Sequence, residues 1–220
     1  MDGDRQRVRA VRERLSRGGP PRIPRDAPDF RTVTLPPREC DLVRDLFVEE
    51  GVRSVVEVGL AYASSALAIG EALVVTGGER HYVVDPFQRS AYGDVGWELL
   101  VESGADRVVE LLRAGSSVAL PGLVERGVVV DAAFVDGSHR FHEVFLDLYY
   151  LRKLVRAHGI VVVDDYWAGS VRAAVRYYEH NLGWAPLERL EDSRCRAYRL
   201  PEPFEPAFEN FVWPGWESRG

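Results

Sequence analysis

The sequence is poor in cysteine, in long apolar runs and in net positive charge, and each shortage argues against a class of protein. Two cysteines among 220 residues are too few to staple a small secreted scaffold, so we expect reduced thiols in a cytoplasmic protein. No stretch approaches the roughly 18 consecutive apolar residues of a membrane span, and residues 1–30 lack the apolar core of a secretory signal. A net charge of −6 argues against a nucleic-acid partner held by bulk electrostatics.

The chain does have enough apolar sequence, 46% of its residues, to bury a core without a metal or a disulfide. Val8, Val11 and Leu15 form a sparse apolar stripe, which predicts a helix over residues 1–18 lying on the domain or on a partner chain. An arginine-rich nucleic-acid arm is the less favoured alternative. The expected organisation is an N-terminal helix with an extended proline-rich linker over residues 1–37, a main domain over residues 38–200, and a tail over residues 201–220.

The tail is rich in aromatic residues, including Phe204, Phe208, Phe211, Trp213 and Trp216. Large apolar side chains are usually buried on folding, because their removal from water is favourable. We therefore expect the tail to pack on the domain or on a second subunit, and a homodimer is one of the two arrangements that this allows.

Short apolar runs rich in β-branched residues alternate with helical segments from residue 38 onward. Near-continuous apolar strands indicate burial on both faces, and hence a parallel sheet covered by helices on each side. Two final strands separated by a short turn predict an antiparallel hairpin. The predicted fold is an α/β, doubly wound, Rossmann-like seven-stranded sheet of five parallel strands plus this C-terminal hairpin. The predicted strands are 54–58, 81–85, 107–112, 132–136, 160–164, 184–190 and 195–200, and the predicted helices between them are 62–75, 94–103, 117–125, 141–156 and 170–182.

Ligands of such sheets bind beyond the carboxyl ends of the strands, so the residues at these ends are the candidates for a site. The first end carries Glu57 and Gly59, followed by small residues at 63–65. A glycine there permits a tight turn and the close approach of a ligand, although the spacing is not the G-x-G-x-x-G of a dinucleotide site. A buried Glu57 needs a donor, and either a ligand amino group or an internal amide or arginine satisfies that need.

The second and third strand ends carry one polar candidate each. Asp85 can accept both hydroxyls of a ribose, or it can start a turn together with Pro86. Ser116 lies in a small polar turn, where it can hydrogen-bond an adenine edge or cap the helix that follows.

Acidic residues and a histidine gather after the fourth and fifth predicted strands: Asp136, His139, Asp164 and Asp165. Three acids in one cleft raise one another's pKa unless a cation lies between them. Hard oxygen ligands suit Mg²⁺, which lets waters and substrate oxygens complete its shell. His139 has the reference pKa of a base at neutral pH. The structural alternative is that Asp165 caps a helix, Asp136 binds the turn backbone and His139 faces solvent.

These motifs resemble those of the class I S-adenosylmethionine-dependent methyltransferases over residues 55–165, in the small-molecule O-methyltransferase branch that includes catechol and macrocin O-methyltransferases. The resemblance rests on Asp136-Gly137-Ser138-His139, on Asp164-Asp165 and on the E-x-G stretch that begins at Glu57. It implies the following site: Glu57, Gly59, Tyr62, Ala63 and Ser65 around the methionine part of the cofactor, Asp85 on its ribose, Ser116 at its adenine, Asp136 beside the cofactor, Asp136, Asp164 and Asp165 as metal ligands, and His139 as the catalytic base.

Three positions depart from the pattern of that family. Ala63 stands where the family usually has glycine, Asp165 where the catechol enzymes have asparagine, and His139 where they have a lysine base. The resemblance implies a metal-dependent O-methyltransferase that moves a methyl group from S-adenosylmethionine to a hydroxyl of a small natural product, sugar or phenol. The alternatives are a metal-independent methyltransferase on the same fold and a non-catalytic S-adenosylmethionine-binding protein. The expected partner is the small-molecule acceptor, with no nucleic acid and no membrane.

Overall fold

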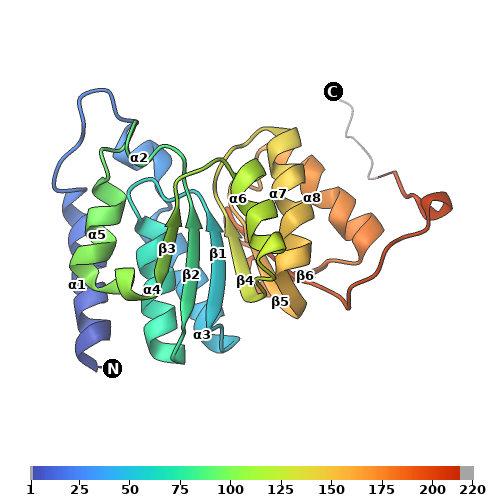
Figure 1. The fold of residues 1–220 in the computed structure, drawn as a ribbon, viewed down its shortest axis with the longest axis horizontal. Coiled ribbons are helices and arrows are strands. Elements are labelled where there is room, and N and C mark those ends of the chain that lie inside the picture. Colours follow the sequence, from blue (N-terminus) through green and yellow to red (C-terminus); the bar gives the residue numbers. More distant parts are fainter. Residues whose placement is uncertain (1, 214–220) are drawn as a thin grey trace. The chain divides into compact units, whose positions relative to one another are not determined.

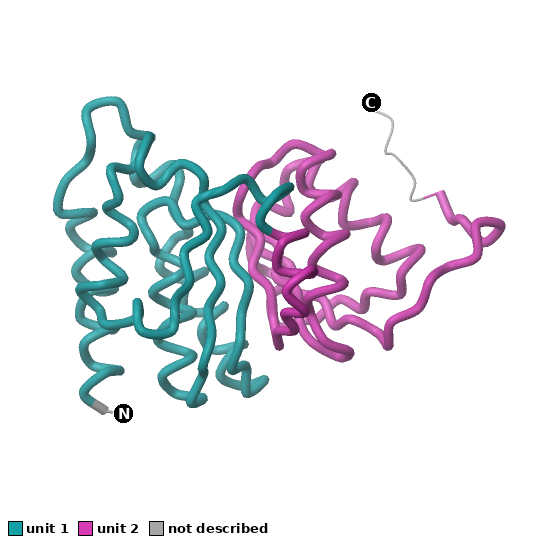
Figure 2. The backbone as a smooth tube through the Cα atoms, in the orientation of Figure 1, with its two compact units in different colours: residues 1–119 teal, residues 120–220 magenta. Residues whose placement is uncertain are grey.

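The computed structural model describes residues 2–213 and contains a seven-stranded sheet with the strand order β3-β2-β1-β4-β5-β7-β6 (Figure 1). Most of the paired strands are parallel, and the last two along the chain pair antiparallel. The predicted doubly wound α/β fold with an antiparallel C-terminal hairpin is therefore confirmed. The chain separates into two compact units, residues 1–119 and residues 120–220 (Figure 2). The expected segments 1–37, 38–200 and 201–220 follow other boundaries and stay a prediction.

In unit 1, three parallel strands end at the same level. They are β1 (Ser54–Val58), β2 (Arg80–Val84) and β3 (Val109–Leu112). Val58 pairs with Val84, and Val84 pairs with Leu112. This register places the residues that follow β1 and β2 side by side at the carboxyl edge of the sheet.

The helices of unit 1 pack in a chain of contacts around α4 (Ser64–Thr76), which lies against α3 (Pro37–Glu49) and α1 (Asp2–Gly18). Helix α1 also contacts α5 (Val95–Ser103), which leads into the short η1 (Ala105–Arg107). The predicted apolar stripe of the N-terminal helix is buried: Val8, Val11 and Leu15 are at most 4% exposed and belong to the core of this unit. The helix therefore lies on its own chain.

Arginines of α1 strengthen this packing. Arg12 forms ion pairs with Glu71 of α4 and with Asp41 of α3, and Arg14 binds Glu102 of α5 through two hydrogen bonds of 2.6 Å. Glu71 is 1% exposed, so its charge needs such a partner. The arginines of this segment thus serve contacts within unit 1.

The proline-rich linker is not extended throughout, and that expectation was wrong in one part. A helical turn, α2 (Phe30–Val33), forms within it because the Asp29 side chain accepts a hydrogen bond from the Thr32 amide and so caps the turn.

Unit 2 contains the remaining strands: β4 (Val130–Val135), β5 (Val155–Val163), β6 (Ala185–Leu187) and β7 (Arg196–Arg199). Val135 pairs with Val163 in the parallel pair, and Val163 pairs with Arg196 in the antiparallel one. The residues after β4 and β5 therefore lie next to each other, and the turn before β7 reaches the same edge. The helices are α7 (Phe141–Leu154), α8 (Gly169–Leu182), η2 (Glu188–Leu190) and η3 (Phe208–Asn210), while α6 (Ser116–Glu125) runs across the boundary between the units.

One expectation for the C-terminal part needs correction: the predicted strand 184–190 ends early because the chain turns into η2 after Leu187. In the tail, Phe208 is 88% and Trp213 65% exposed, while Phe211 has a ring contact with Tyr177 at 6.3 Å. Packing of the tail on a second subunit stays a prediction. Trp216 lies outside the described residues. Between residues 2 and 213, each helix is too short or too polar to cross a membrane.

Candidate functional site

The loop after β1 turns sharply through backbone conformations that side chains rarely adopt. Gly59 has a φ of 97°, Ala61 of 44° and Ala63 of 65°. A non-glycine residue in such a conformation costs about 1–3 kcal/mol and persists only where its surroundings impose it. The tight turn expected at Gly59 is present, and the two alanines continue it up to the first residue of α4.

Asp85 imposes this conformation. Its Oδ2 accepts hydrogen bonds from the Leu60 amide at 3.2 Å and the Ala61 amide at 3.0 Å. The Gln88 side chain donates to the same oxygen at 2.9 Å and to the Ala61 carbonyl at 2.8 Å. Oδ1 accepts from the Phe87 amide at 2.7 Å. Asp85 thus fastens the loop after β1 to the loop after β2, and its contact with a ribose stays a prediction.

Gln88 was not predicted as a site residue from the sequence, and the structure shows that it is fully buried. The signal that was available is its position three residues after Asp85, where an amide can reach back to the carboxylate across a turn.

Glu57 has internal partners, but not the amide or arginine considered for it. Its Oε1 accepts a hydrogen bond from the Ser65 hydroxyl at 2.6 Å, and its Oε2 lies 2.8 Å from Nε2 of His81. Glu57 and His81 are both fully buried. Because Glu57 pairs with Val83 in the sheet, His81 lies two residues earlier on the same face. No sequence motif singles out this histidine, and a contact of Glu57 with the methionine part of a cofactor stays a prediction.

Tyr62 is directed toward the N-terminal linker. Its side chain is fully buried, its hydroxyl donates to the Pro28 carbonyl at 3.0 Å, and its ring meets Phe30 and Tyr92 edge to face at 5.6 and 5.2 Å. Tyr62 therefore holds the linker on unit 1. Ser116 is half-buried and is the first residue of α6, and the roles predicted for these two residues at a cofactor remain untested.

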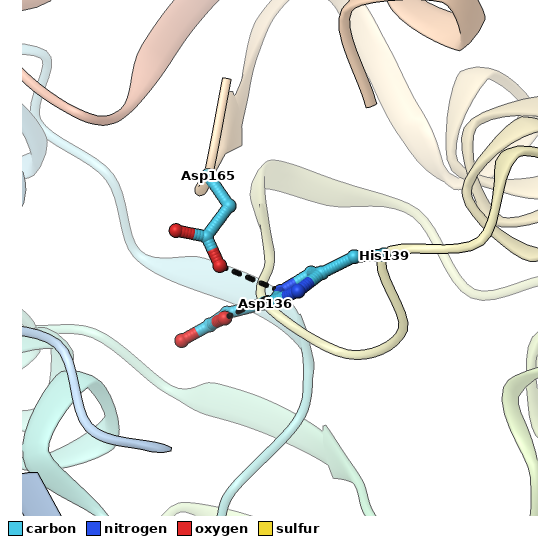
Figure 3. Close-up of side chains that lie close together, drawn as sticks. All are labelled: Asp136, His139 and Asp165. Carbon is cyan, nitrogen blue, oxygen red and sulfur yellow. Dashed lines mark ion pairs between the residues drawn. The ribbon is translucent and has the colours of Figure 1, made fainter. Parts of the chain in front are cut away.

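In unit 2, a histidine and two aspartates meet at the carboxyl ends of β4 and β5 (Figure 3). His139 Nε2 lies 2.7 Å from Asp165 Oδ2 and 3.9 Å from Asp136 Oδ1. The potential ligand atoms of the three residues all lie within 4.8 Å of one another. The cluster thus contains Asp136 and Asp165 of the predicted metal set, but His139 takes the place that was predicted for Asp164.

Asp164 is bound to other groups. Arg194 Nε donates to its Oδ1 at 2.9 Å, and Arg194 Nη2 lies 2.8 Å from its Oδ2. The Cys195 thiol lies 3.1 Å from Oδ1. Mg²⁺ binds carboxylate oxygens whose lone pairs are free to point at the ion. Arg194 competes for this carboxylate, and the predicted metal set of three aspartates stays a prediction.

Asp165 connects the two groups of contacts. It forms an ion pair with Arg194, and its Oδ1 accepts a hydrogen bond from the Trp167 indole at 2.7 Å. Arg194 could not be found from the sequence, since it lies 30 residues beyond Asp164 in a segment predicted to be a plain turn.

The charges of this cluster shift the pKa values of its members. Burial raises the pKa of Asp136 to about 7, and the nearby carboxylates of Asp164 and Asp165 add to this effect. The carboxylates of Asp136 and Asp165 raise the pKa of His139 to about 10. Burial alone would raise the pKa of Asp165, but hydrogen bonds from His139 and Trp167 and the charge of Arg194 lower it. At neutral pH, His139 is therefore an imidazolium, whereas the sequence reasoning assumed the ordinary pKa of a free histidine.

We predict that the ring of His139 titrates near pH 10 in the cofactor-free protein. A raised pKa means that folding favours the charged form, so this stabilisation is complete below the unfolded pKa of about 6.5 and is lost as the pH rises through 10. Nuclear magnetic resonance titration of ¹⁵N-labelled protein measures the midpoint. Asp165→Asn should move it toward 6.5, because the closest carboxylate is removed. A wild-type midpoint near 6.5 would show that the two carboxylates do not act on the ring.

The sequence model of a family described as "Methyltransferase domain" matches residues 56–166. A search of curated proteins gave no match. The fold is similar to an O-methyltransferase from Bacillus cereus in complex with SAH, with a TM-score of 0.62 and 14% identity over 90% of this chain and 91% of that one. It is also similar to the O-methyltransferase TomG from Streptomyces achromogenes, involved in tomaymycin synthesis and in complex with SAM, with a TM-score of 0.61 and 18% identity over 92% and 91% of the two chains.

Proposed function

The chain belongs to the methyltransferase-domain family, whose sequence model matches half of its length, and from this premise we propose that it transfers a methyl group from S-adenosylmethionine to a hydroxyl of a small molecule. The observation that carries the choice of an oxygen acceptor is the His139–Asp165 pair at 2.7 Å, because a hydroxyl must lose its proton to become a good nucleophile. The similar folds of O-methyltransferases that hold SAM or SAH support the same donor.

The residues of unit 2 handle the proton in this proposal. The reactive form of His139 is the neutral imidazole, whose fraction grows as the pH rises toward the pKa of about 10. In this form Asp165 accepts the hydrogen of Nε2, which leaves Nδ1 as the nitrogen that receives the proton of the acceptor hydroxyl. S-adenosylmethionine supplies an electrophilic methyl group when it is bound. The bond from sulfur to methyl breaks, the bond from oxygen to methyl forms, and the products are S-adenosylhomocysteine, a methyl ether and a proton on His139. A positioned base contributes about 10²–10⁴-fold to such a step.

The residues of unit 1 hold the donor in this proposal. The loop after β1, fixed by Asp85, presents its backbone at the carboxyl edge of the sheet, where ligands of such folds bind. For the acceptor we propose a hydroxyl of a natural product, phenol or sugar, which the resemblance of the sequence motifs implied and the similarity to a tomaymycin-synthesis enzyme supports.

Two measurements test this function. Isothermal titration calorimetry should show that S-adenosylhomocysteine binds and that excess NAD⁺ does not displace it. Incubation with [methyl-³H]S-adenosylmethionine and a panel of phenols, catechols and hydroxylated sugars should then label at least one acceptor on oxygen. Labelling of amines or thiols in place of hydroxyls would contradict oxygen as the acceptor atom. Displacement by NAD⁺ would contradict the donor.

A further inference from the structure

Arg194 contacts both of the adjacent aspartates that were predicted to bind a metal. Its guanidinium meets Asp164 through Nε and Nη2, at 2.9 Å from Oδ1 and 2.8 Å from Oδ2, and Nη2 also pairs with Asp165. Asp164 is 2% and Asp165 3% exposed. Two nearly buried carboxylates therefore share one cation that belongs to the chain itself.

We propose that Arg194 permanently supplies the positive charge that a divalent cation was predicted to supply at Asp164 and Asp165, so that methyl transfer proceeds without a bound metal. This inference rests on the proposed function. Arginine keeps its charge at every pH that the protein meets, and its planar fork of donors matches a carboxylate through two parallel contacts.

Arg194 lies against both oxygens of Asp164. Its Nε donates to Oδ1, where the Cys195 thiol also lies at 3.1 Å, and its Nη2 lies 2.8 Å from Oδ2, which accepts no hydrogen bond from the described residues. A cation that binds this carboxylate must displace Arg194 or lie against its positive charge. Displacing Arg194 would leave the guanidinium without its partners, and breaking a buried ion pair in this way is strongly destabilising.

The backbone around Arg194 is fixed, so the guanidinium is held in place. The Tyr166 amide donates to the Arg194 carbonyl at 3.0 Å, and the Cys195 amide donates to the Ser193 hydroxyl at 3.0 Å. Directly after Cys195, β7 begins, and its Arg196 pairs with Val163 of β5. Because β5 ends at Val163, directly before Asp164, the antiparallel register carries Arg194 alongside the two acids.

Arg194 acts through the carboxylates, so it is a positioning residue and its test needs a readout other than activity. Mn²⁺ is titrated into the full-length chain with and without S-adenosylhomocysteine, and electron paramagnetic resonance measures the bound ion. For the wild type we expect no Mn²⁺ site with a dissociation constant below about 1 mM. Arg194→Met should bind Mn²⁺ at least tenfold more tightly, because the acids lose their cation. The matched control is Arg196→Met, which removes a guanidinium from the same segment. The Arg196 guanidinium contacts the Leu190 and Ser193 carbonyls and the Tyr166 ring.

Activity gives the second readout. With an acceptor found in the labelling panel, wild-type turnover should change less than twofold after exhaustive treatment with EDTA, and Arg194→Lys should keep more activity than Arg194→Met. A tenfold loss in EDTA that Mg²⁺ restores would overturn the inference, as would micromolar Mn²⁺ binding by the wild type that Asp164→Asn abolishes. If Arg194→Met does not fold, the EDTA experiment and the Mn²⁺ titration of the wild type still decide the question. A wild type that binds no S-adenosylhomocysteine and labels no acceptor contradicts the proposed function instead, while the Mn²⁺ titration still tests the charge at this site.

Discussion

Replacing His139 with alanine should lower the turnover of methyl transfer by at least a hundredfold, while S-adenosylhomocysteine binds within about threefold of the wild-type affinity. The imidazole is the base of the proposed reaction, and loss of a positioned base removes about 10²–10⁴ in rate, which is roughly 3–5 kcal/mol of barrier at 1.36 kcal/mol per decade. Transfer of ³H from the labelled donor measures turnover, and calorimetry measures binding. His142→Ala is the control, since His142 is another exposed histidine, three residues further along the chain.

The raised pKa of His139 makes the same assignment testable by pH. Since the two carboxylates hold the proton on the ring up to about pH 10, wild-type turnover should climb as the pH rises from 7 toward 10. Asp165→Asn should shift that rise to lower pH, because the imidazolium loses its closest anion. Near-normal turnover in His139→Ala, combined with a large loss in Asp136→Asn, would transfer the base role to Asp136, whose pKa of about 7 suits it to that work.

The strand ends were predictable because they depend on local patterns. Buried apolar strands followed by glycine or an acid place their polar residues at one edge of a parallel sheet, and this is how Asp85, Asp136 and Asp165 were found. The apolar spacing of Val8, Val11 and Leu15 likewise gave both the helix and the face that it buries.

The partners of these residues were not predictable, because they depend on the register between distant segments. Arg194 reaches Asp164 only through the antiparallel pairing of β5 with β7. His81 reaches Glu57 only through the parallel register of β1 with β2. No period within either segment encodes these pairings, and for this reason the arginine beside Asp164 and the histidine beside Glu57 could not be predicted.

The second large effect is expected at Asp85, where alanine should lower the free energy of unfolding by about 3 kcal/mol and weaken S-adenosylhomocysteine binding at least tenfold. The carboxylate holds the amides of Leu60, Ala61 and Phe87 and the side chain of Gln88. A buried donor left without an acceptor costs about 1–3 kcal/mol. The expected loss of stability is smaller than the sum of four such penalties. Phe87 is 59% exposed, so its amide can hydrogen-bond to water, and the strained turn at Ala61 relaxes once the carboxylate is removed.

Urea unfolding of the cofactor-free protein separates this role from a direct contact with the ribose. If Asp85 met only the cofactor, alanine would reduce affinity and leave the cofactor-free stability unchanged. If it fastens the two loops, stability and affinity fall together, and Asp85→Asn should not rescue them because its amide group would face donors. Glu79→Ala is the matched control, since that side chain is 72% exposed in a surface ion pair and such pairs contribute less than about 1 kcal/mol. An unchanged urea midpoint in Asp85→Ala would mean that the packing around the loop, rather than this carboxylate, holds Ala61 and Ala63 in their left-handed conformations.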